Sequence, residues 1–373
     1  VDALLAAARE AGASDVHLLP GEDGLKMSWR IDGVLQPVHG FPAAVSPNIV
    51  SRLKVLAELL TYRTDVPQEG RIRGQGSDVE MRVSTFPTLH GEKGVVRLFV
   101  GSGRFRHLDD LGLPDDIAAT LRNLLGETGG VILVTGPAGS GKTTTLYACL
   151  RELAGLAPVE RSISTLEDPI EAVLPGVAQS QVRPAAGFDY ETGLKSLMRQ
   201  DPEVIMVGEI RDPGTAEIVF QASLTGHLVL TTFHAGSAAE AVGRLLDMGI
   251  EPYQLRSGIL AVINQRLVRR LCDCAAEGTG PDDRMGLDVA RFRLSVGCEQ
   301  CAGTGYRDRM IVAEMLLPNM KDMARAILAR RDARHIEQQA IEAGMVSRWT
   351  RILQAVEAGE TSPAEVRRVM GFR

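Results

Sequence analysis

The chain has 373 residues, of which 45% are apolar and 24% are charged, and these values indicate a soluble globular protein with two or three domains. The 41 basic and 47 acidic residues give a net charge of −6, which argues against a general nucleic-acid binder. No apolar run approaches the roughly 20 residues that a membrane-spanning helix needs.

The start of the chain and its cysteines indicate its cellular context. The first five residues, 1–5, contain no basic segment and no initiator methionine, so we expect a fragment of a longer chain and not a signal peptide. Five cysteines are few for a secreted disulfide scaffold, and four of them cluster late in the sequence. This distribution favours a cytosolic metal site over disulfides.

Residues 1–100 are predicted to form a mixed α+β domain. An apolar stripe suits an amphipathic helix that ends near Gly12, and Asp32-Gly33 is typical of a hairpin turn. The expected elements are a helix over 4–11, strands over 16–19, 25–31 and 34–35, a helix over 49–60, and strands over 79–83 and 95–100. Four arginines, Arg30, Arg71, Arg82 and Arg97, fall in or beside these strands, either as solvated surface residues or as contacts for an anion.

A linker and a helix start precede the second domain. Gly101-Ser102-Gly103 is the best candidate for a flexible joint. Pro114-Asp115-Asp116 then predicts the start of a helix, and Ile117, Leu121 and Leu124 give that helix an apolar stripe.

The strongest motif in the chain is a phosphate-binding loop between a predicted strand and a predicted helix. The apolar run 131–135 precedes a G-x-x-x-x-G-K-T sequence, and the helix-compatible run 144–150 follows it. Glycines let backbone N–H groups turn toward phosphate oxygens, and the helix N-terminus adds its positive dipole end. Lys142 would reach the β- and γ-phosphates, and the Thr143 hydroxyl would reach Mg²⁺. The predicted nucleotide contacts are Gly136, Pro137, Ala138, Gly139, Ser140, Gly141, Lys142, Thr143 and Thr144. The alternative is a glycine-rich turn that matches by chance.

Two further predicted strands end in acidic residues. The run 162–166 leads into Glu167-Asp168-Pro169-Ile170-Glu171, and the run 204–207 leads into Gly208 and Glu209. Ligands bind at the carboxyl ends of strands in such sheets, so a metal-bound nucleotide is the natural partner of these acids. The second run is a Walker B pattern with Gly208 where Asp is common, so metal contact there could pass through water or depend on the first cluster. The alternatives are an acidic turn and a buried strand with a chance acid.

A third strand, over 228–233, is flanked by His227 and His234. A lone histidine at such a place is usually a satisfied core residue. Two histidines at the ends of a strand in a nucleotide domain could instead sense the γ-phosphate or bridge to a neighbouring chain.

Four late cysteines have the spacing of a zinc site. Cys298 and Cys301 form a C-x-x-C pair, while Cys272 and Cys274 form a tighter C-x-C pair. Four thiolates suit tetrahedral Zn²⁺, with metal-free thiols as the alternative. Cys149, in the helix after the phosphate loop, is predicted to pack in the core. From about Met310 the chain is predicted to be largely helical, and a capping box at 362–365 starts its final helix.

In their order and spacing, these motifs resemble those of the secretion ATPase superfamily, which powers type II secretion and type IV pilus machines. The resemblance covers most of residues 130–272, and the N-terminal block, with 13–17 and 30–35, is similar to the second N-terminal domain of those proteins. It implies an α/β fold in which a RecA-like P-loop ATPase domain follows an N-terminal α+β (PAS-like) domain, with a small zinc-binding insert and a helical C-terminal subdomain. The implied divisions are 1–100, a linker over 101–107, the ATPase core over 108–271, the tetracysteine subdomain over 272–307 and the helical subdomain over 308–373.

The resemblance also implies roles. Arg82 and Arg97 would contact phosphate, Glu171 would activate water, and Glu209 would help hold Mg²⁺. Glu167 and Asp168, with the two histidines, would line the nucleotide. The cofactors would be ATP, Mg²⁺ and Zn²⁺. The family implies a homohexamer in the cytoplasm, at the cytoplasmic face of the bacterial inner membrane. Its partners would be a membrane platform and other secretion proteins, bound partly through a first N-terminal domain that is expected to be missing here. No nucleic acid partner and no membrane span are implied.

Three alternatives remain open beside a type II secretion motor. One is a type IV pilus assembly ATPase. Another is an ATPase that translocates nucleic acid, which the acidic net charge disfavours. The third is a nucleotide-gated scaffold with little hydrolysis, against which the intact Lys142, Thr143, Glu171 and Glu209 argue.

Overall fold

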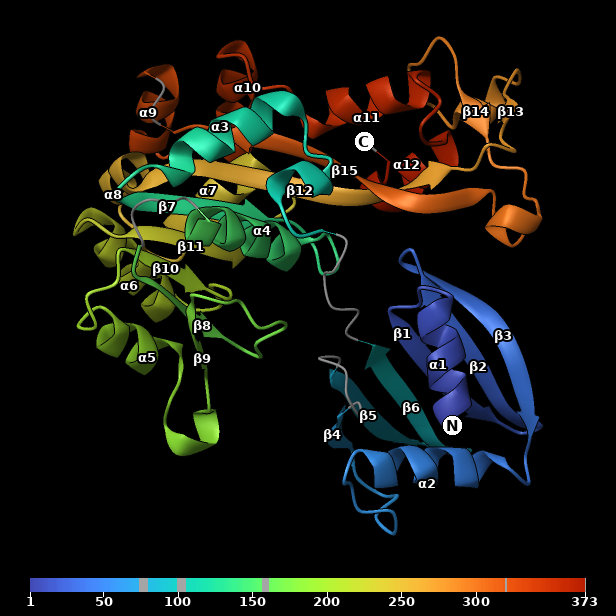
Figure 1. The fold of residues 1–373 in the computed structure, drawn as a ribbon. Helices are drawn as coiled ribbons and strands as arrows, with labels where there is room; N and C mark the ends of the chain where they lie inside the picture. Colours follow the sequence, from blue (N-terminus) through green and yellow to red (C-terminus); the bar gives the residue numbers. More distant parts are fainter. Residues whose placement is uncertain (74–79, 99–104, 156–160, 319–320, 373) are drawn as a thin grey trace. The chain divides into compact units, whose positions relative to one another are not determined.

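Figure 1 shows a computed structural model of the chain, which describes residues 1–73, 80–98, 105–155, 161–318 and 321–372. The chain divides into two compact units, Val1–Gly103 and Arg104–Arg373. The predicted linker Gly101-Ser102-Gly103 lies outside the described residues. Within those residues, no helix has the length and apolar character needed to cross a membrane.

The first unit is a six-stranded antiparallel sheet in the order β3-β2-β1-β6-β5-β4, with two helices on one face. Alternate residues such as Val16 and Leu18 turn toward the helices, which is the pattern of a sheet with one buried face. Asp32 and Gly33 both have positive φ, as a two-residue turn of this kind requires. The elements are α1 (Asp2–Glu10), β1 (Asp15–Gly21), β2 (Gly24–Ile31), β3 (Val34–Pro42), α2 (Ser46–Leu56), β4 (Gln68–Arg73), β5 (Glu80–Thr88) and β6 (Gly91–Leu98).

The second unit is built on a seven-stranded sheet in the order β15-β12-β7-β11-β10-β8-β9, in which only the β12–β15 pair is antiparallel. Every residue of β7, β10 and β11 is buried, as in a parallel sheet covered on both faces. The strands are β7 (Gly130–Thr135), β8 (Ile163–Glu167), β9 (Ala178–Gln181), β10 (Val204–Val207), β11 (Leu228–Phe233), β12 (Ile259–Leu271) and β15 (Tyr306–Leu316), with a small separate pair, β13 (Ala276–Glu277) and β14 (Arg293–Leu294).

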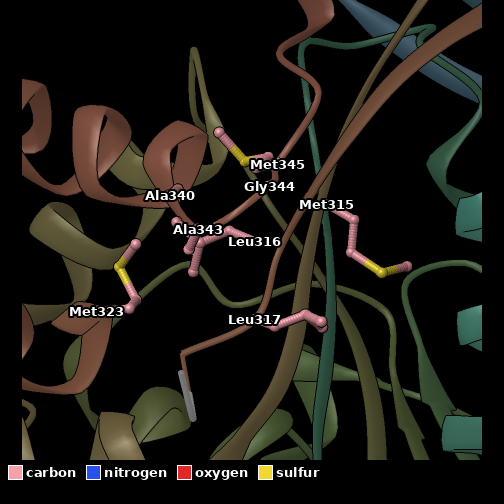
Figure 2. Close-up of a pocket in the computed structure, with 8 residues that line it drawn as sticks. All are labelled: Met315, Leu316, Leu317, Met323, Ala340, Ala343, Gly344 and Met345. Carbon is pink, nitrogen blue, oxygen red and sulfur yellow. The ribbon is translucent and has the colours of Figure 1, made fainter. Parts of the chain in front are cut away.

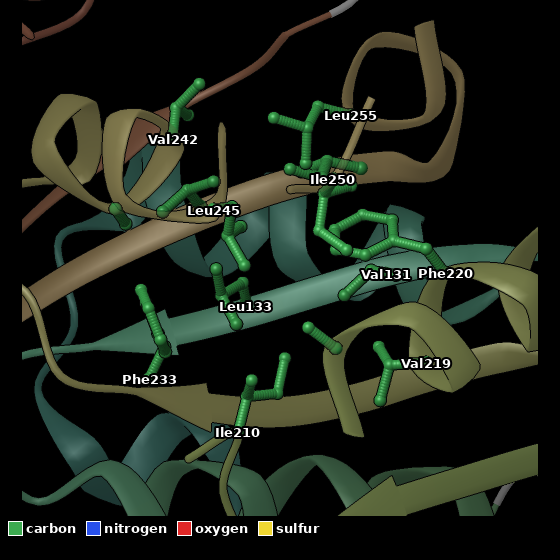
Figure 3. Close-up of a cluster of buried hydrophobic side chains, with 14 of the residues drawn as sticks. Val131, Leu133, Ile210, Val219, Phe220, Phe233, Val242, Leu245, Ile250 and Leu255 are labelled. Atoms are coloured by element: carbon green, nitrogen blue, oxygen red, sulfur yellow. The ribbon is translucent and has the colours of Figure 1, made fainter. Parts of the chain in front are cut away.

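Helices cover both faces of this sheet. On one face Ile132 and Val134 pack with α3 (Asp115–Leu125) and α4 (Lys142–Gly155). On the other face Val131 and Leu133 share a core with residues such as Phe220 and Val242, as Figure 3 shows. The helices that contribute to this second core are α5 (Tyr190–Leu197), α6 (Pro213–Leu224), α7 (Ala238–Asp247), α8 (Pro252–Gly258), α9 (Lys321–Leu328) and α10 (Ala333–Glu342).

The segment from Met310, predicted to be largely helical, is a strand as far as Leu316, so that prediction was wrong. Its run Ile311-Val312-Ala313 is buried and pairs with β12, a 13-residue strand that the sequence analysis did not identify. Pairing across about 40 residues of chain decided the conformation, because short apolar runs do not distinguish strand from helix. The helical part begins at α9 and continues through α11 (Arg348–Glu357) and α12 (Pro363–Met370).

An apolar pocket of about 110 Å³ lies where β15 ends beside α9 and α10 (Figure 2). Its lining has no charged or hydroxyl side chain. The lining residues are Met315, Leu316, Leu317, Met323, Ala340, Ala343, Gly344 and Met345.

A buried ion-pair cluster attaches α12 to β12. Ser362 caps α12 as predicted, but the Glu365 carboxylate does not complete the capping box. It is fully buried and accepts hydrogen bonds from Arg269 at 2.7 and 2.9 Å and from Arg368. Burial acts to raise the pKa of Glu365, yet the two arginines hold that pKa below its usual value.

We expect Glu365→Gln to lower the free energy of unfolding by about 3 kcal/mol at pH 7, because Arg269, whose side chain is only 13% exposed, loses its buried anionic partner. Since the folded-state pKa is depressed, the ionised carboxylate stabilises the fold above the unfolded-state pKa of about 4.3, and this stabilisation is lost at lower pH. Denaturant unfolding at pH 7 and pH 4 measures both effects. Glu217→Gln, on an exposed position of α6, is the control. An equal change in both variants would contradict the prediction.

Candidate nucleotide and metal sites

The phosphate-binding loop lies at the carboxyl end of β7, and α4 begins within it at Lys142. Gly136, Gly139 and Gly141 all have positive φ, a conformation that other residues rarely adopt. A Cβ atom on Gly136 would also lie 2.5 Å from the Gln265 carbonyl oxygen. The glycines are therefore required by the backbone path, which aims the loop and the start of α4 at one point.

Lys142 is folded over this loop. Its Nζ donates to the carbonyl oxygens of Gly136 at 3.1 Å and Pro137 at 2.9 Å. Burial lowers the pKa of Lys142, while the charges of Glu209 and Glu171 act in the opposite direction. These three residues follow β7, β10 and β8, and the parallel pairing of the sheet brings the carboxyl ends of these strands to the edge that carries the loop.

The sequence analysis missed Gln265, which holds the loop from β12. Gln265 is fully buried, and its Nε2 donates to the Ser140 carbonyl oxygen at 2.7 Å. Its Oε1 accepts from Thr145 Oγ1 at 3.0 Å, and the neighbouring Asn264 donates to Thr135 Oγ1 at 2.9 Å. Two amides side by side directly after the apolar run 259–263 were the signal that could have identified these contacts.

The three acids after β8 have different environments. Glu167 is 2% exposed and accepts from Tyr147 and Thr165, each at 2.5 Å, and from Gln179 at 3.1 Å. These bonds occupy both carboxylate oxygens. Glu167 therefore has its hydrogen-bond partners within the chain and does not face the open edge of the sheet. Asp168 is exposed and lies 3.4 Å from Arg211. Glu171 is also exposed.

Glu209 follows β10 and meets partners from two segments. Its Oε1 accepts from Arg211 Nε at 2.6 Å, and its Oε2 lies 3.4 Å from His234 Nε2. The glycine before it also has a structural reason. A Cβ on Gly208 would lie 2.7 Å from Tyr190 Oη, so the aspartate that is common at this place in Walker B motifs would require Tyr190 to shift.

The two histidines of β11 lie at opposite ends of the strand. β11 runs parallel to β7, with Leu228 beside Gly130 and Phe233 beside Thr135, so His234 reaches the edge with the phosphate loop. His227 lies about 23 Å away along the strand direction. Its Nδ1 is 3.0 Å from the Ala222 carbonyl oxygen near the end of α6. The structure therefore does not bring His227 to the nucleotide edge, and the prediction that it contacts the nucleotide there was wrong for a single chain.

In the first unit, Arg71, Arg82 and Arg97 lie directly opposite one another on β4, β5 and β6. Arg82 and Arg97 alternate with core residues and so turn to the face away from the helices. Arg82 pairs with Glu69 at 2.6 Å, and Arg97 pairs with Asp15 at 3.1 Å. Arg30 joins the row at Asp15, at 3.6 Å. This row of arginines gives the open sheet face a surface suited to anions.

The four late cysteines form one cluster, with all ligand atoms within 4.8 Å of one another. Three sulfur pairs are 3.7, 3.8 and 3.9 Å apart. Metal–sulfur bonds of about 2.3 Å in a tetrahedron give sulfur separations of about 3.8 Å, so the cluster has the dimensions of a metal site. The pairs that meet are Cys272 with Cys298, Cys274 with Cys301, and Cys298 with Cys301.

Backbone groups favour a thiolate in this cluster. The N–H groups of Cys298 and Gly305 donate to the Cys301 sulfur at 3.1 and 3.2 Å. Burial acts to raise the pKa of Cys301, but these donors lower it to about 6. Metal ligation requires deprotonated sulfur, so the donor set and its surroundings fit a bound metal ion.

A parallel sheet with a phosphate loop and two acids at its carboxyl edge defines a P-loop nucleotide-binding protein. A model of the family described as "Type II/IV secretion system protein" matches residues 1–368. The chain belongs to this family, and the resemblance to secretion ATPases is confirmed.

Named relatives agree with this assignment. The chain is 42% identical to the type II secretion system ATPase E of Vibrio cholerae over 378 residues, which cover 99% of the chain and 74% of the relative. It is 42% identical to the type II secretion system protein HxcR of Pseudomonas aeruginosa over 373 residues, covering 99% and 76%. It is also 38% identical to the type IV pilus assembly ATPase PilB of Thermus thermophilus over 344 residues, which are 89% of the chain but 38% of PilB.

Solved structures confirm the fold. The pilus retraction motor PilT with bound ADP has a TM-score of 0.67 at 24% identity, covering 98% of this chain and 95% of that one. The Legionella pneumophila ATPase DotB has a TM-score of 0.68 at 21% identity, covering 98% and 94%. The predicted α/β ATPase architecture is therefore confirmed.

Proposed function

We propose that this chain is the ATP-hydrolysing part of a motor that drives type II protein secretion, through pseudopilus assembly, at the cytoplasmic face of the bacterial inner membrane. The observation that carries the proposal is the phosphate loop at the carboxyl end of β7, with Lys142 folded over it and with Glu209 after the parallel strand β10. Relatives named type II secretion proteins, which align with 99% of this chain, support the cellular role.

Each residue at the loop edge has a distinct task in hydrolysis. Backbone N–H groups of the loop and Lys142 bind the phosphates, and the Thr143 hydroxyl is placed to hold a metal ion. Mg²⁺, when bound, neutralises charge on the β- and γ-phosphates. Glu209 is oriented by Arg211 and His234 and helps to hold the metal ion. The exposed Glu171 orients the attacking water.

Completion of the site by a second chain follows from the family resemblance. We propose a homohexamer in which Arg82 and Arg97 supply positive charge to the phosphates and so stabilise the transition state. The domain boundaries at 100, 107 and 271 belong to this proposal, as do contacts with an inner-membrane platform. The predicted boundary at 307 falls inside β15, which pairs with β12 in the central sheet, so the helical subdomain begins after Leu316. The four cysteines hold a structural Zn²⁺ that fixes the end of β12.

The test is the ATPase rate per chain measured over a wide range of protein concentration. We expect a steep rise with concentration in the wild type and a loss of about 100-fold or more in Glu171→Gln and Arg82→Ala. Arg9→Ala, at an exposed position of α1, is the control. A rate that does not change with concentration while the protein stays monomeric would contradict the shared site. A barely detectable rate in every variant would favour a nucleotide-gated scaffold.

A type IV pilus assembly ATPase is the second candidate, favoured by the 38% identity to PilB. The same chemistry would serve it, and only the moved protein would differ. The chain can be expressed in a strain that lacks its type II secretion ATPase and in a strain that lacks its pilus assembly ATPase. Restored secretion in the first strain without restored piliation in the second would favour the first candidate.

A further inference from the structure

The Tyr147 hydroxyl joins the helix of the phosphate loop to the acidic segment after β8. Tyr147 lies on α4, five residues after Lys142, and its side chain is 2% exposed. Its Oη donates to Glu167 Oε2 at 2.5 Å. The same oxygen accepts from the backbone N–H of Glu171 at 3.0 Å and, more weakly, from that of Ala172 at 3.4 Å. One hydroxyl therefore contacts both a buried carboxylate and the backbone of the residue assigned to orient water.

The proton positions at this hydroxyl follow from its partners. Two backbone N–H groups point at the oxygen and can only donate, so the phenolic proton is directed to Glu167. Burial, together with the nearby Glu167 charge, raises the pKa of Tyr147, so the group stays a phenol at neutral pH. Hydrogen bonds to a charged acceptor are short and strong, which makes this link rigid.

Glu167 is itself fixed, so the link has a firm base. Thr165 Oγ1 and Gln179 Nε2 hold its other oxygen. Gln179 also donates to the Ala172 carbonyl oxygen at 2.9 Å and accepts from the Leu174 N–H at 2.7 Å. Hydrogen bonds to Tyr147 and to Gln179 thus hold the backbone around Glu171, while the Glu171 side chain remains exposed.

We propose that Tyr147 is a positioning residue for Glu171, and this inference rests on the proposed ATP hydrolysis. Because α4 starts at Lys142, the hydroxyl fixes the distance between the phosphate-binding end of that helix and the backbone of Glu171. Glu167 is the buried anchor of this contact and not a ligand of the nucleotide. A misplacement of about 1 Å at a water-orienting group can cost about 100-fold in rate, so a single hydrogen bond at this place is enough to matter.

Tyr147→Phe tests the inference, because it keeps the ring and removes only the hydroxyl. We expect kcat to fall about tenfold or more while KM changes by less than about twofold, since phosphate binding by the loop is left intact. In a Glu171→Gln background the same change should lower the residual rate by less than about twofold, because Tyr147 acts through Glu171.

Two controls separate positioning from stability. Tyr306→Phe removes a different buried tyrosine hydroxyl, which contacts Ser362 at 2.6 Å outside the Tyr147–Glu167–Glu171 network, and should lower Tm about as much while kcat stays within about threefold. Tyr253→Phe, at an exposed position, should change neither. Equal kcat losses in Tyr147→Phe and Tyr306→Phe, or wild-type kcat in Tyr147→Phe, would overturn the inference. Hydrolysis that survives Glu171→Gln would instead overturn the proposed role of Glu171, and an inactive wild type would overturn the proposed function.

Discussion

Lys142→Ala is expected to lower the rate of ATP hydrolysis by about 10³-fold, because the site loses the charge that the phosphate loop itself brings to the transferred phosphate. Lys142 Nζ already lies over the loop, 2.9 Å from the Pro137 carbonyl oxygen, so it needs little movement to meet a phosphate. Burial makes the charged form of Lys142 unfavourable when no anion is near, and it lowers the pKa of the side chain for this reason. A phosphate beside Lys142 would therefore stabilise the charged form.

Thermal unfolding with and without ATP separates binding from folding in this variant. A ligand at 100 times its Kd stabilises a protein by about 2.7 kcal/mol, and we expect this shift to disappear in Lys142→Ala. Without nucleotide, Tm should stay the same or rise, since a buried charge has been removed. Lys195→Ala, at an exposed lysine of α5 paired with Glu191, is the control. An ATP-dependent Tm shift of wild-type size would contradict the assigned role.

The phosphate-loop edge could be predicted because its determinants are local in sequence. Gly136, Lys142 and the acid Glu209 each follow a continuous apolar run, and parallel strands bring their carboxyl ends to one edge. The same local logic located the Asp32-Gly33 turn, where the backbone conformation itself selects the residues.

Features decided by pairing between distant segments were not predictable. β15 became a strand because β12 was available beside it, and Gln265 reaches the loop from a segment more than a hundred residues away. His227 and His234 look equivalent in sequence, but the direction of β11 separates them. Glu167 looked like a ligand because its partners Tyr147 and Gln179 come from other elements.

The cysteine cluster has one half that could be predicted from the local sequence and one half that could not. Its C-x-x-C half was clear, whereas the tight C-x-C half depends on the path of β12, which ends at Leu271 and delivers Cys272 and Cys274 to opposite partners. A spacing that is unusual for a zinc site thus still gives tetrahedral dimensions, because the turn at 272–275 that follows β12 directs the two sulfurs to different partners.

Cys298→Ser is expected to lower bound zinc from about one ion per chain to nearly none, since a structural site needs all four ligands. Structural zinc contributes about 10–16 kcal/mol of apparent binding free energy at pH 7, so its loss should unfold the segment that it ties together. Elemental analysis gives the metal content, and limited proteolysis within 272–307 reports the local unfolding.

The matched control is Cys149→Ala, which removes the cysteine that lies outside the cluster, buried in α4. It should keep the metal and resist cleavage in 272–307, although its small cavity lowers Tm slightly. Gln265 lies on β12 and Cys272 directly follows that strand. Unfolding of the cluster should therefore free the end of β12 and leave the Gln265 contact in place, because β7 and β15 hold this part of the strand. ATP binding should therefore survive in Cys298→Ser. Zinc at the wild-type level in that variant would show that the four sulfurs do not act together as the metal site.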